Sequence, residues 1–462
     1  MKRLLASLLI LSSMSLAAAC GDDDDDKTPN TPDSGTPDTE QPFEESVSNN
    51  ITQDTTWKSN GTYTLTKYIF VESGTLTIEA GARILGNEGS ALVITRNARI
   101  NAVGTAEKPI VFTSSRPVGQ REPGDWGGVA LLGKARINST GGETTLEGFF
   151  ATSGNDLVKY GGNDDAHNCG TLKYVRIEFA GFELAPNNEL NGLTMGACGS
   201  ATETDYVQVH LGLDDGIEMF GGTAPLKHIV ITRADDDALD YDLGYSGKVQ
   251  FLVVQQSPER GDRGIEASSN RSTPTQEPIS IPEIWNATFI GSGAAPTGNP
   301  TQEALVFNTG AGVRMRNSIV AHWKNQAVDI DGTASAALFN ETGDARLSFK
   351  NTFFWDIADS NTAIPFAPNP VVVNGTTTDA DATKLDESKV ILSEANKVTL
   401  TDPRLSEPLS VTAPNFAPAA GSAALNADAA LTPGSGFDTT ARFIGAVGST
   451  DWTRGWTAYP EN

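Results

Sequence analysis

The chain has 462 residues, of which 38% are hydrophobic, and it carries 33 Lys and Arg against 58 Asp and Glu. The formal net charge of −25 disfavours nucleic acid or an anionic membrane face as a partner, because like charges repel. Cations or neutral glycans suit this charge better.

The first 19 residues have the composition of a secretory signal peptide. Lys2 and Arg3 precede an apolar stretch from Leu4 to about Ile10, and small residues lead into Cys20. The run into Cys20 resembles a bacterial lipobox, with Ala17 where Leu is commoner. We therefore expect Cys20 to be lipidated and to anchor the protein to a membrane through its N-terminus. Ordinary signal cleavage that leaves a spare thiol is the alternative.

Residues 20–50 are predicted to form a disordered tether. Five aspartates, Asp22–Asp26, are followed by a Thr, Pro, Ser and Glu-rich stretch with too few apolar residues for a core. An acidic run directly after the cysteine is similar to the export signals of surface-displayed lipoproteins in some Gram-negative bacteria. The expected location is the outer membrane, surface-exposed, with the periplasmic face as the alternative. The run also fits a plain solvated linker.

Residues 51–355 are predicted to form an all-β solenoid. Three successive segments between 205 and 268 share one pattern, in which Ile217, Leu239 and Ile265 recur 22 and 26 residues apart. Such a period is typical of a stacked repeat. Short runs of alternating apolar residues, separated by Gly, Asp or Pro turns and lacking helical periodicity, indicate a parallel β-helix.

The turns before and after this stretch are less regular. Ile78 and Ile94, 16 residues apart, lie in two similar segments that we take as the first turns. Long loop insertions are expected at 139–170, 269–283 and 294–300. We expect residues 356–462 to form irregular last turns and an aromatic-rich cap on the final turn, because an uncapped β-helix exposes strand edges.

Three asparagines, Asn286, Asn317 and Asn351, follow one another at the same place in successive turns, so they are expected to hydrogen-bond along the axis. Trp126, between glycines, is more typical of packing than of a sugar platform. Cys169 and Cys198 are close to one repeat apart, and in an oxidising compartment we expect them to form a disulfide.

Strand alternation predicts two columns of outward-facing residues along the repeats. One contains Thr194, Glu218, Asp240, Glu266, Val306 and Asp329; the other contains Asn191, Asp215, Asp237, Arg263, Glu303 and Gln326. Carboxylates stacked about 4.8 Å apart repel by roughly 3 kcal/mol per pair at an effective dielectric constant of 20.

A bound Ca²⁺ would offset this repulsion, because carboxylate oxygens from neighbouring turns can supply its ligands. The candidate binding and metal-ligating residues are Asp215, Glu218, Asp237, Asp240 and Glu266. The alternative is that these aspartates make Asx-type turns and their exposed charges are solvated. No contiguous calcium-loop motif decides between the two.

Several segments resemble a family of uncharacterised bacterial surface lipoproteins with a single-stranded right-handed parallel β-helix, similar in architecture to pectate lyases and polygalacturonases. The segments are GDWGG (124–128), YGGNDDAHNCG (160–170), ELNGLTMG (189–196), LDDGIEMFGG (213–222) and GYSGKVQF (244–251). The resemblance covers about 57–270 and 440–457, and it implies the fold but no activity.

The enzymes of this architecture are matched poorly. Polygalacturonases are similar only in their paired aspartates, which Asp236 and Asp237 could imitate. Lyases are similar in pairing Ca²⁺ with an Arg or Lys base, for which Arg233, Arg260 or Arg263 beside Asp237 are the candidates, Arg263 first. Three functions therefore stay open: cation-assisted binding of an extracellular polymer or surface partner, a lyase or hydrolase of uronate-rich glycans, and a structural or adhesive rod.

Overall fold

The structure, a computed structural model, describes residues 41–147, 156–185, 188–293, 302–357, 371–373, 376–378, 387 and 391–462. The predicted signal peptide, Cys20 and the tether as far as residue 40 lie outside this range. The residues from Pro42 to Asn462 form one compact unit.

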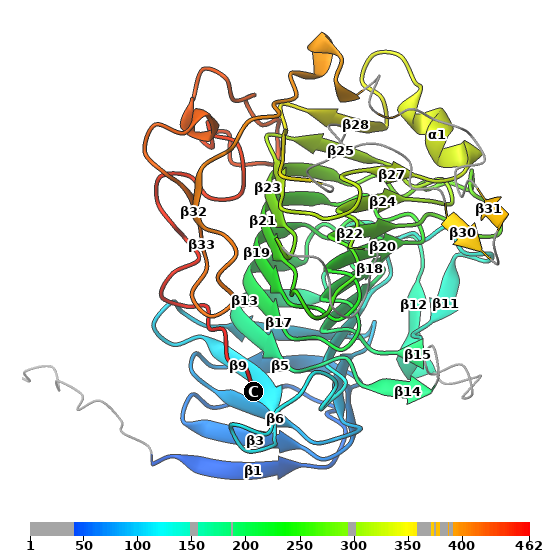
Figure 1. The fold of residues 1–462 in the computed structure, drawn as a ribbon. Helices are drawn as coiled ribbons and strands as arrows, with labels where there is room; N and C mark the ends of the chain where they lie inside the picture. Colours follow the sequence, from blue (N-terminus) through cyan, green and yellow to red (C-terminus); the bar gives the residue numbers. More distant parts are fainter. Residues whose placement is uncertain are drawn as a thin grey trace, which may run out of the picture. The chain divides into compact units, whose positions relative to one another are not determined.

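Two long parallel sheets form the walls of a β-helix, as the repeats predicted (Figure 1). The smaller sheet has nine strands: β4 (Tyr68–Val71), β7 (Ala91–Ile94), β10 (Val129–Leu132), β16 (Leu193–Gly196), β18 (Ile217–Phe220), β20 (Leu239–Asp242), β22 (Ile265–Ala267), β24 (Leu305–Phe307) and β27 (Asp329–Ile330).

The larger sheet has sixteen strands and bends around a corner of the helix. Its members are β1 (Phe43–Val47), β2 (Thr55–Trp57), β3 (Gly61–Leu65), β5 (Gly74–Ile78), β6 (Arg83–Gly86), β8 (Ala98–Val103), β9 (Ile110–Ser114), β13 (Gly170–Glu178), β17 (Glu203–His210), β19 (Leu226–Thr232), β21 (Lys248–Gln255), β23 (Glu283–Ile290), β25 (Val313–Arg316), β26 (Ile319–Ala321), β28 (Leu347–Lys350) and β29 (Phe353–Trp355).

The core is a stack of apolar side chains from successive turns. Ile217 pairs with Leu239, and Leu239 pairs with Ile265, and all three are fully buried. This stack confirms the predicted phase of the central repeats. The 16-residue spacing of Ile78 and Ile94 was misleading, because these isoleucines belong to different sheets.

The β-helix begins before the predicted boundary at residue 51. Strand β1 pairs in parallel with β3 over its whole length, so Phe43–Val47 belong to the sheet and not to the tether. Four of its five side chains are exposed, which explains why its composition indicated a linker.

Insertions project from the turns as small antiparallel pairs and one short helix. These elements are β11 (Glu143–Thr145) with β12 (Lys159–Gly161), β14 (Glu183–Ala185) with β15 (Asn188–Glu189), β30 (Val371–Val373) with β31 (Thr376–Thr378), and α1 (Thr333–Phe339). The first pair lies in the predicted excursion at 139–170. The predicted loop at 294–300 lies outside the described residues.

One corner of the helix is built from residues in the left-handed backbone region, with φ between 48° and 62°. They are Tyr174, Tyr206, His228, Phe251, Asn286, Asn317 and Asn351, one per turn. The four rings stack with centroids 4.2–4.6 Å apart. Asn351 donates to Asn317 Oδ1 at 2.7 Å, which confirms hydrogen bonding along the axis for this pair, whereas Asn286 Nδ2 donates to the carbonyl oxygen of Phe443 at 2.7 Å. Asparagine suits these positions because it tolerates left-handed backbone better than most residues.

Two further predictions about the core are confirmed. Cys169 and Cys198 form a disulfide with their Cα atoms 5.8 Å apart, and both side chains are buried. Trp126 is fully buried, and its Nε1 donates to the carbonyl oxygen of Glu178 at 2.9 Å. Its role is therefore packing and not sugar stacking.

The C-terminal segment differs from the predicted cap. Among its described residues, those near Asn396 and Thr399 pair with the final turn. Residues 405–462, including β32 (Leu405–Glu407) and β33 (Asn415–Pro418), run back along the outside of the larger sheet (orange and red in Figure 1). Trp456 reaches Tyr174 and Tyr206, with ring centroids 5.9 Å apart. The aromatic end therefore covers the stacked corner rings in the middle of the helix.

Candidate functional site

The predicted outward column on the smaller sheet has the expected register. Glu218 pairs with Asp240, and Asp240 pairs with Glu266, because β18, β20 and β22 are consecutive neighbours. Thr194 precedes this series and Val306 and Asp329 follow it. The inward partners are core residues, so strand alternation directs the carboxylates away from the core.

The second column lies in the turns that lead into these strands. Asp215 Oδ1 accepts a hydrogen bond from the backbone N–H of Asp237 at 3.0 Å. Asp237 Oδ1 accepts one from the backbone N–H of Arg263 at 2.8 Å. These bonds connect neighbouring turns, so each aspartate has a structural role as well as a charge.

Three of the five predicted carboxylates are buried and the other two are partly exposed, although the sequence predicts an exposed face for all of them. The exposed fractions are 8% for Glu218, 7% for Asp215 and 1% for Asp237. The interpretation that these charges are simply solvated is therefore wrong for these three residues. The sequence contained no signal for this burial, because it depends on how the neighbouring turns and insertions pack.

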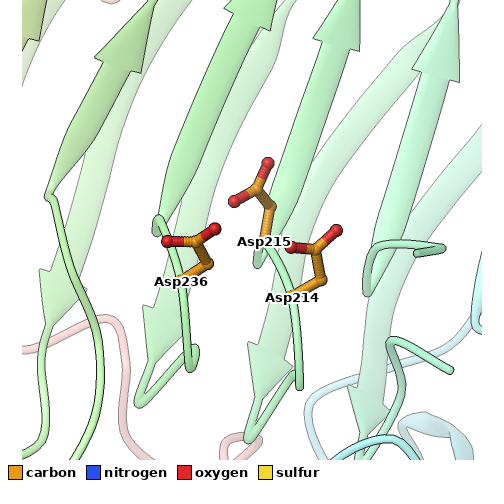
Figure 2. A group of neighbouring side chains, drawn as sticks. All are labelled: Asp214, Asp215 and Asp236. Atoms are coloured by element: carbon orange, nitrogen blue, oxygen red, sulfur yellow. The ribbon is translucent and has the colours of Figure 1, made fainter. Parts of the chain in front are cut away.

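Four overlapping groups of three carboxylates bring one oxygen from each residue within 4.8 Å of the others. They are Asp214, Asp215 and Asp236 (Figure 2); Asp215, Glu218 and Asp240; Asp236, Asp237 and Asp262; and Asp237, Asp240 and Glu266. All five predicted site residues are therefore brought together. Asp262 was not predicted as a site residue, and its position beside Arg263 in the sequence was the only signal for it.

The two columns, with Glu218, Asp240 and Glu266 in one and Asp215, Asp237, Arg263 and Glu303 in the other, are together called the ladder. Burial of its carboxylates raises their electrostatic free energy. It raises the pKa of Asp215, Glu218, Asp237 and Asp240 well above the usual range, and the neighbouring carboxylates add to the effect for each residue. Arg263 opposes the shift at Asp237. Burial also raises the pKa of Glu303 to about 7. Such shifts are typical of functional sites, although structural ion-pair networks also produce them.

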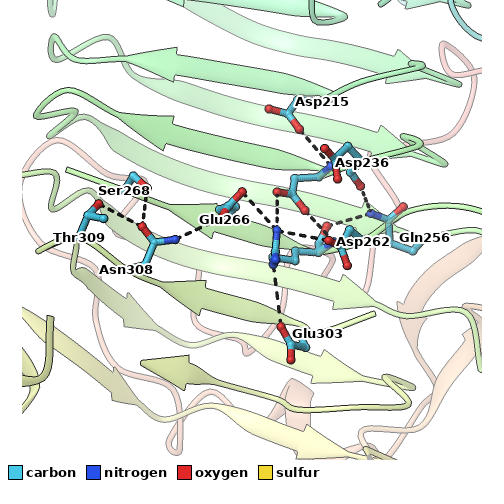
Figure 3. A network of polar contacts seen from close by, with 11 residues as sticks. Asp215, Asp236, Gln256, Asp262, Glu266, Ser268, Glu303, Asn308 and Thr309 are labelled. Carbon is cyan, nitrogen blue, oxygen red and sulfur yellow. Dashed lines mark hydrogen bonds and ion pairs between the residues drawn. The ribbon is translucent and has the colours of Figure 1, made fainter. Parts of the chain in front are cut away.

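The positive charge of Arg263 neutralises the carboxylates around it, of which Asp262, Glu266 and Glu303 are labelled in Figure 3. Its Nη1 lies 3.5 Å from Asp237, 3.3 Å from Asp262 and 3.2 Å from Glu266, and its Nε lies 3.9 Å from Glu303. Burial alone lowers the pKa of Arg263, but these four carboxylates together raise it above its usual value. The guanidinium is therefore held as a fixed positive charge.

Around Glu218, some polar atoms lack hydrogen-bond partners among the described residues. Asn191 is 3% exposed and its Nδ2 donates to Glu218 Oε2 and, at 3.3 Å, to Thr194 Oγ1, but its Oδ1 has no hydrogen-bond partner among the described residues. The buried Oδ1 of Asp240 likewise accepts no hydrogen bond from any described residue. Unpaired buried acceptors cost free energy, and a cation would remove that cost.

A cavity of about 540 Å³ adjoins the ladder at Glu266. Its other lining residues include Arg271, Asn308, Thr309, Asp331 and Thr333, which are all polar. Asn308 Nδ2 donates to Glu266 Oε1 at 3.2 Å, and its Oδ1 accepts from Ser268 and Thr309 (Figure 3). The cavity therefore presents hydroxyl, amide and charged groups to a ligand directly beside the carboxylates.

The β-helix matches a known protein family. A model described as a pectate-lyase like beta helix domain matches residues 49–397. The chain belongs to this family. No curated protein and no solved structure matches the chain. Among the residues that the structure describes, no helix combines the length and apolar character needed to span a bilayer.

Proposed function

We propose that this pectate-lyase-like β-helix binds an extracellular polymer through a divalent cation, most simply Ca²⁺, held by Asp215, Glu218 and Asp240. The observation that carries the proposal is a carboxylate triad, with Asp215 and Glu218 buried and Asp240 partly buried, that makes no ion pair with a basic side chain of the described residues. No Lys or Arg nitrogen of the described residues forms an ion pair with any of the three within 4.0 Å. Buried charges are otherwise paired or coordinate metals.

Calcium fits the chemistry of this donor set. Ca²⁺ takes six to eight oxygen ligands, and it accepts carboxylates in one- or two-oxygen modes together with amide oxygens. The three carboxylates would supply most of the ligands, and Asn191 Oδ1 is a further oxygen beside them. Ligand positions that the protein leaves open would be available to hydroxyl or carboxylate groups of the polymer.

The hydroxyl, amide and charged groups that line the cavity support a saccharide as the polymer unit. The cavity shares Glu266 with the ladder, and Arg271 on its wall is exposed. A chain of sugars lying along the smaller sheet could contact the cation and the cavity together. The acidic surface would otherwise repel an anionic polymer, so the cation would be needed for its attachment.

A lyase or hydrolase that uses Asp237 and Arg263 is supported less well. Asp237 is 1% exposed, and both of its oxygens interact with Arg263. The raised pKa of Arg263 makes its guanidinium a poor base. Turnover of uronate-rich glycans that is lost in Asp237→Asn would favour the enzyme.

A rod without a ligand would show neither binding nor turnover.

We also propose that Cys20 carries a lipid that holds the β-helix at the outer membrane, on the cell surface. The signal-like N-terminus and the acidic residues after Cys20 support this location. Protease treatment of intact cells should remove the protein, and Cys20→Ser should release it into the soluble fraction. Protection from protease in intact cells, followed by digestion after lysis, would instead place it on the periplasmic face.

Thermal unfolding with calcium and with a chelator tests the cation. Calcium should raise the thermal midpoint of the wild type, because a ligand that binds only the folded state stabilises it. Glu218→Gln should remove most of that shift, whereas Glu44→Gln, an exposed residue of β1, should retain it. Retention on a glycan array should follow the same pattern. A wild-type midpoint unaffected by calcium would overturn the proposal.

A further inference from the structure

Arg263 occupies a position in the ladder where the two preceding turns have aspartate. Asp215, Asp237 and Arg263 follow one another in the same column, because each aspartate accepts the backbone N–H of the next column member. The ladder therefore changes sign at the third turn. Its neighbours in the other column, Asp240 and Glu266, remain acidic.

The guanidinium lies among carboxylates that would otherwise resemble the first triad. Asp237, Asp240 and Glu266 form one group with oxygens within 4.8 Å, as Asp215, Glu218 and Asp240 do. Arg263 Nη1 contacts two members of that second group at 3.5 and 3.2 Å. The positive charge is therefore positioned where a metal ion would be expected to neutralise the same oxygens.

The side chain of Arg263 is fixed from both sides. Nη1 also lies 3.3 Å from Asp262, and Nε lies 3.9 Å from Glu303 in the next turn. Ion pairs in four directions restrict the guanidinium to this location. In the part of the chain that the structure describes, no Lys or Arg forms an ion pair with the first triad, and Glu218 instead accepts a hydrogen bond from the neutral amide of Asn191.

We infer that Arg263 is a built-in cation that takes the place of a second metal ion. The acidic face therefore binds one divalent cation, at Asp215, Glu218 and Asp240, and removal of the guanidinium opens a second site at Asp237, Asp240 and Glu266. The expectation that the wild type binds one ion rests on the proposed function. The expectation that removal of the guanidinium adds one binding site does not.

The test is the stoichiometry of calcium binding, measured by titration calorimetry with CaCl₂ on the folded β-helix. The wild type should bind one calcium ion and Arg263→Met should bind two. Arg263→Lys, which keeps the positive charge, should bind one, and so should Arg271→Met, which removes an exposed arginine of the adjacent cavity. Adding Glu266→Gln to Arg263→Met should return the count to one.

The outcomes separate this inference from the proposed function. Two ions in the wild type, or no additional ion in Arg263→Met, would overturn the inference. No ion in the wild type and one in Arg263→Met would refute the proposed function while leaving the inference intact. Should Arg263→Met not fold, Arg263→Gln, which also removes the positive charge, is the second variant. It should bind one ion more than the wild type, and a count equal to that of the wild type would overturn the inference.

Discussion

His210 Nε2 lies 2.9 Å from the carbonyl oxygen of Pro460, a residue 250 positions later in the chain. Its Nδ1 lies 2.7 Å from Thr232 Oγ1, so both ring nitrogens are satisfied when the imidazole is neutral. The contact fixes the C-terminal segment to strand β17. It is one of several such contacts, since Gln208 also bonds the backbone N–H and carbonyl of Ala458 at 3.0 and 2.7 Å.

This contact predicts a specific dependence of stability on pH. Burial lowers the pKa of His210 from 6.5 to about 4, and the neighbouring Arg233 and Arg176 act in the same direction. The unfolded chain therefore binds a proton between pH 6.5 and pH 4 that the folded protein excludes. Stability should fall as the pH decreases through this window, by up to about 3 kcal/mol.

The variant His210→Gln should lack this contribution. Glutamine keeps a donor for Pro460 but does not titrate, so the difference in free energy of unfolding between wild type and variant should change between pH 7 and pH 4. Urea unfolding at both values measures it. A comparison with the variant is necessary because Asp235 and Asp242, whose pKa burial raises to about 6, contribute stability in the opposite sense. An unchanged difference would show that His210 does not titrate as argued.

The disulfide should be a major contributor to stability. Cys169 and Cys198 are 29 positions apart, and closing a loop of this length in the unfolded chain is worth about 3–4 kcal/mol. Cys169→Ala/Cys198→Ala should therefore lower the thermal midpoint in non-reducing buffer. Dithiothreitol should lower the midpoint of the wild type and leave that of the double variant unchanged. Equal midpoints for the two oxidised proteins would refute this prediction.

The left-handed backbone and the hydrogen bonds of Asn317 predict how its substitution changes the free energy of unfolding. This residue is fully buried with φ of 49°, its Nδ2 donates to the carbonyl of Leu431 at 2.8 Å, and its Oδ1 accepts from Leu431 and Asn351. Asn317→Ala loses these bonds and adds backbone strain, so it should cost about 3 kcal/mol or more.

Asn317→Gly loses the same bonds but tolerates the backbone, so it should be about 1 kcal/mol more stable than the alanine variant. Chemical unfolding measures the difference, and Asn97→Ala, an exposed asparagine without positive φ, is the control. If alanine were as stable as glycine, the strain at this corner would be negligible.

The sequence predicted the interior of the β-helix better than its outside. Alternation with a period of two and the recurrence of Ile217, Leu239 and Ile265 determined which side chains stack, and hence the register of Glu218, Asp240 and Glu266. These are local consequences of strand geometry. The contact between His210 and Pro460 could not be predicted, because it depends on the path of the C-terminal segment.

Burial was the property of the candidate site that the sequence could not supply. Glu218, on the outward side of a strand, and Asp237, in a turn, are residue types usually exposed at such positions, yet both are buried. Whether a charged side chain is buried depends on how neighbouring turns of different length pack over it. No local sequence pattern encodes that packing. The pairing of Arg263 with Glu303 likewise required the spacing of neighbouring turns across an insertion.

Asp240→Asn should have opposite effects on the protein with and without calcium. Burial and the nearby carboxylate of Glu266 raise the pKa of Asp240, and its Oδ1 accepts no hydrogen bond among the described residues. Replacing the charge with an amide relieves this repulsion, so the calcium-free variant should be more stable than the wild type, by about 1–2 kcal/mol. The same change removes a cation ligand, so calcium should stabilise the variant less. Thermal unfolding in chelator and in excess calcium measures both effects, and the order of the two midpoints should reverse between the conditions. A variant that is less stable in both would indicate that Asp240 has a structural role without a cation.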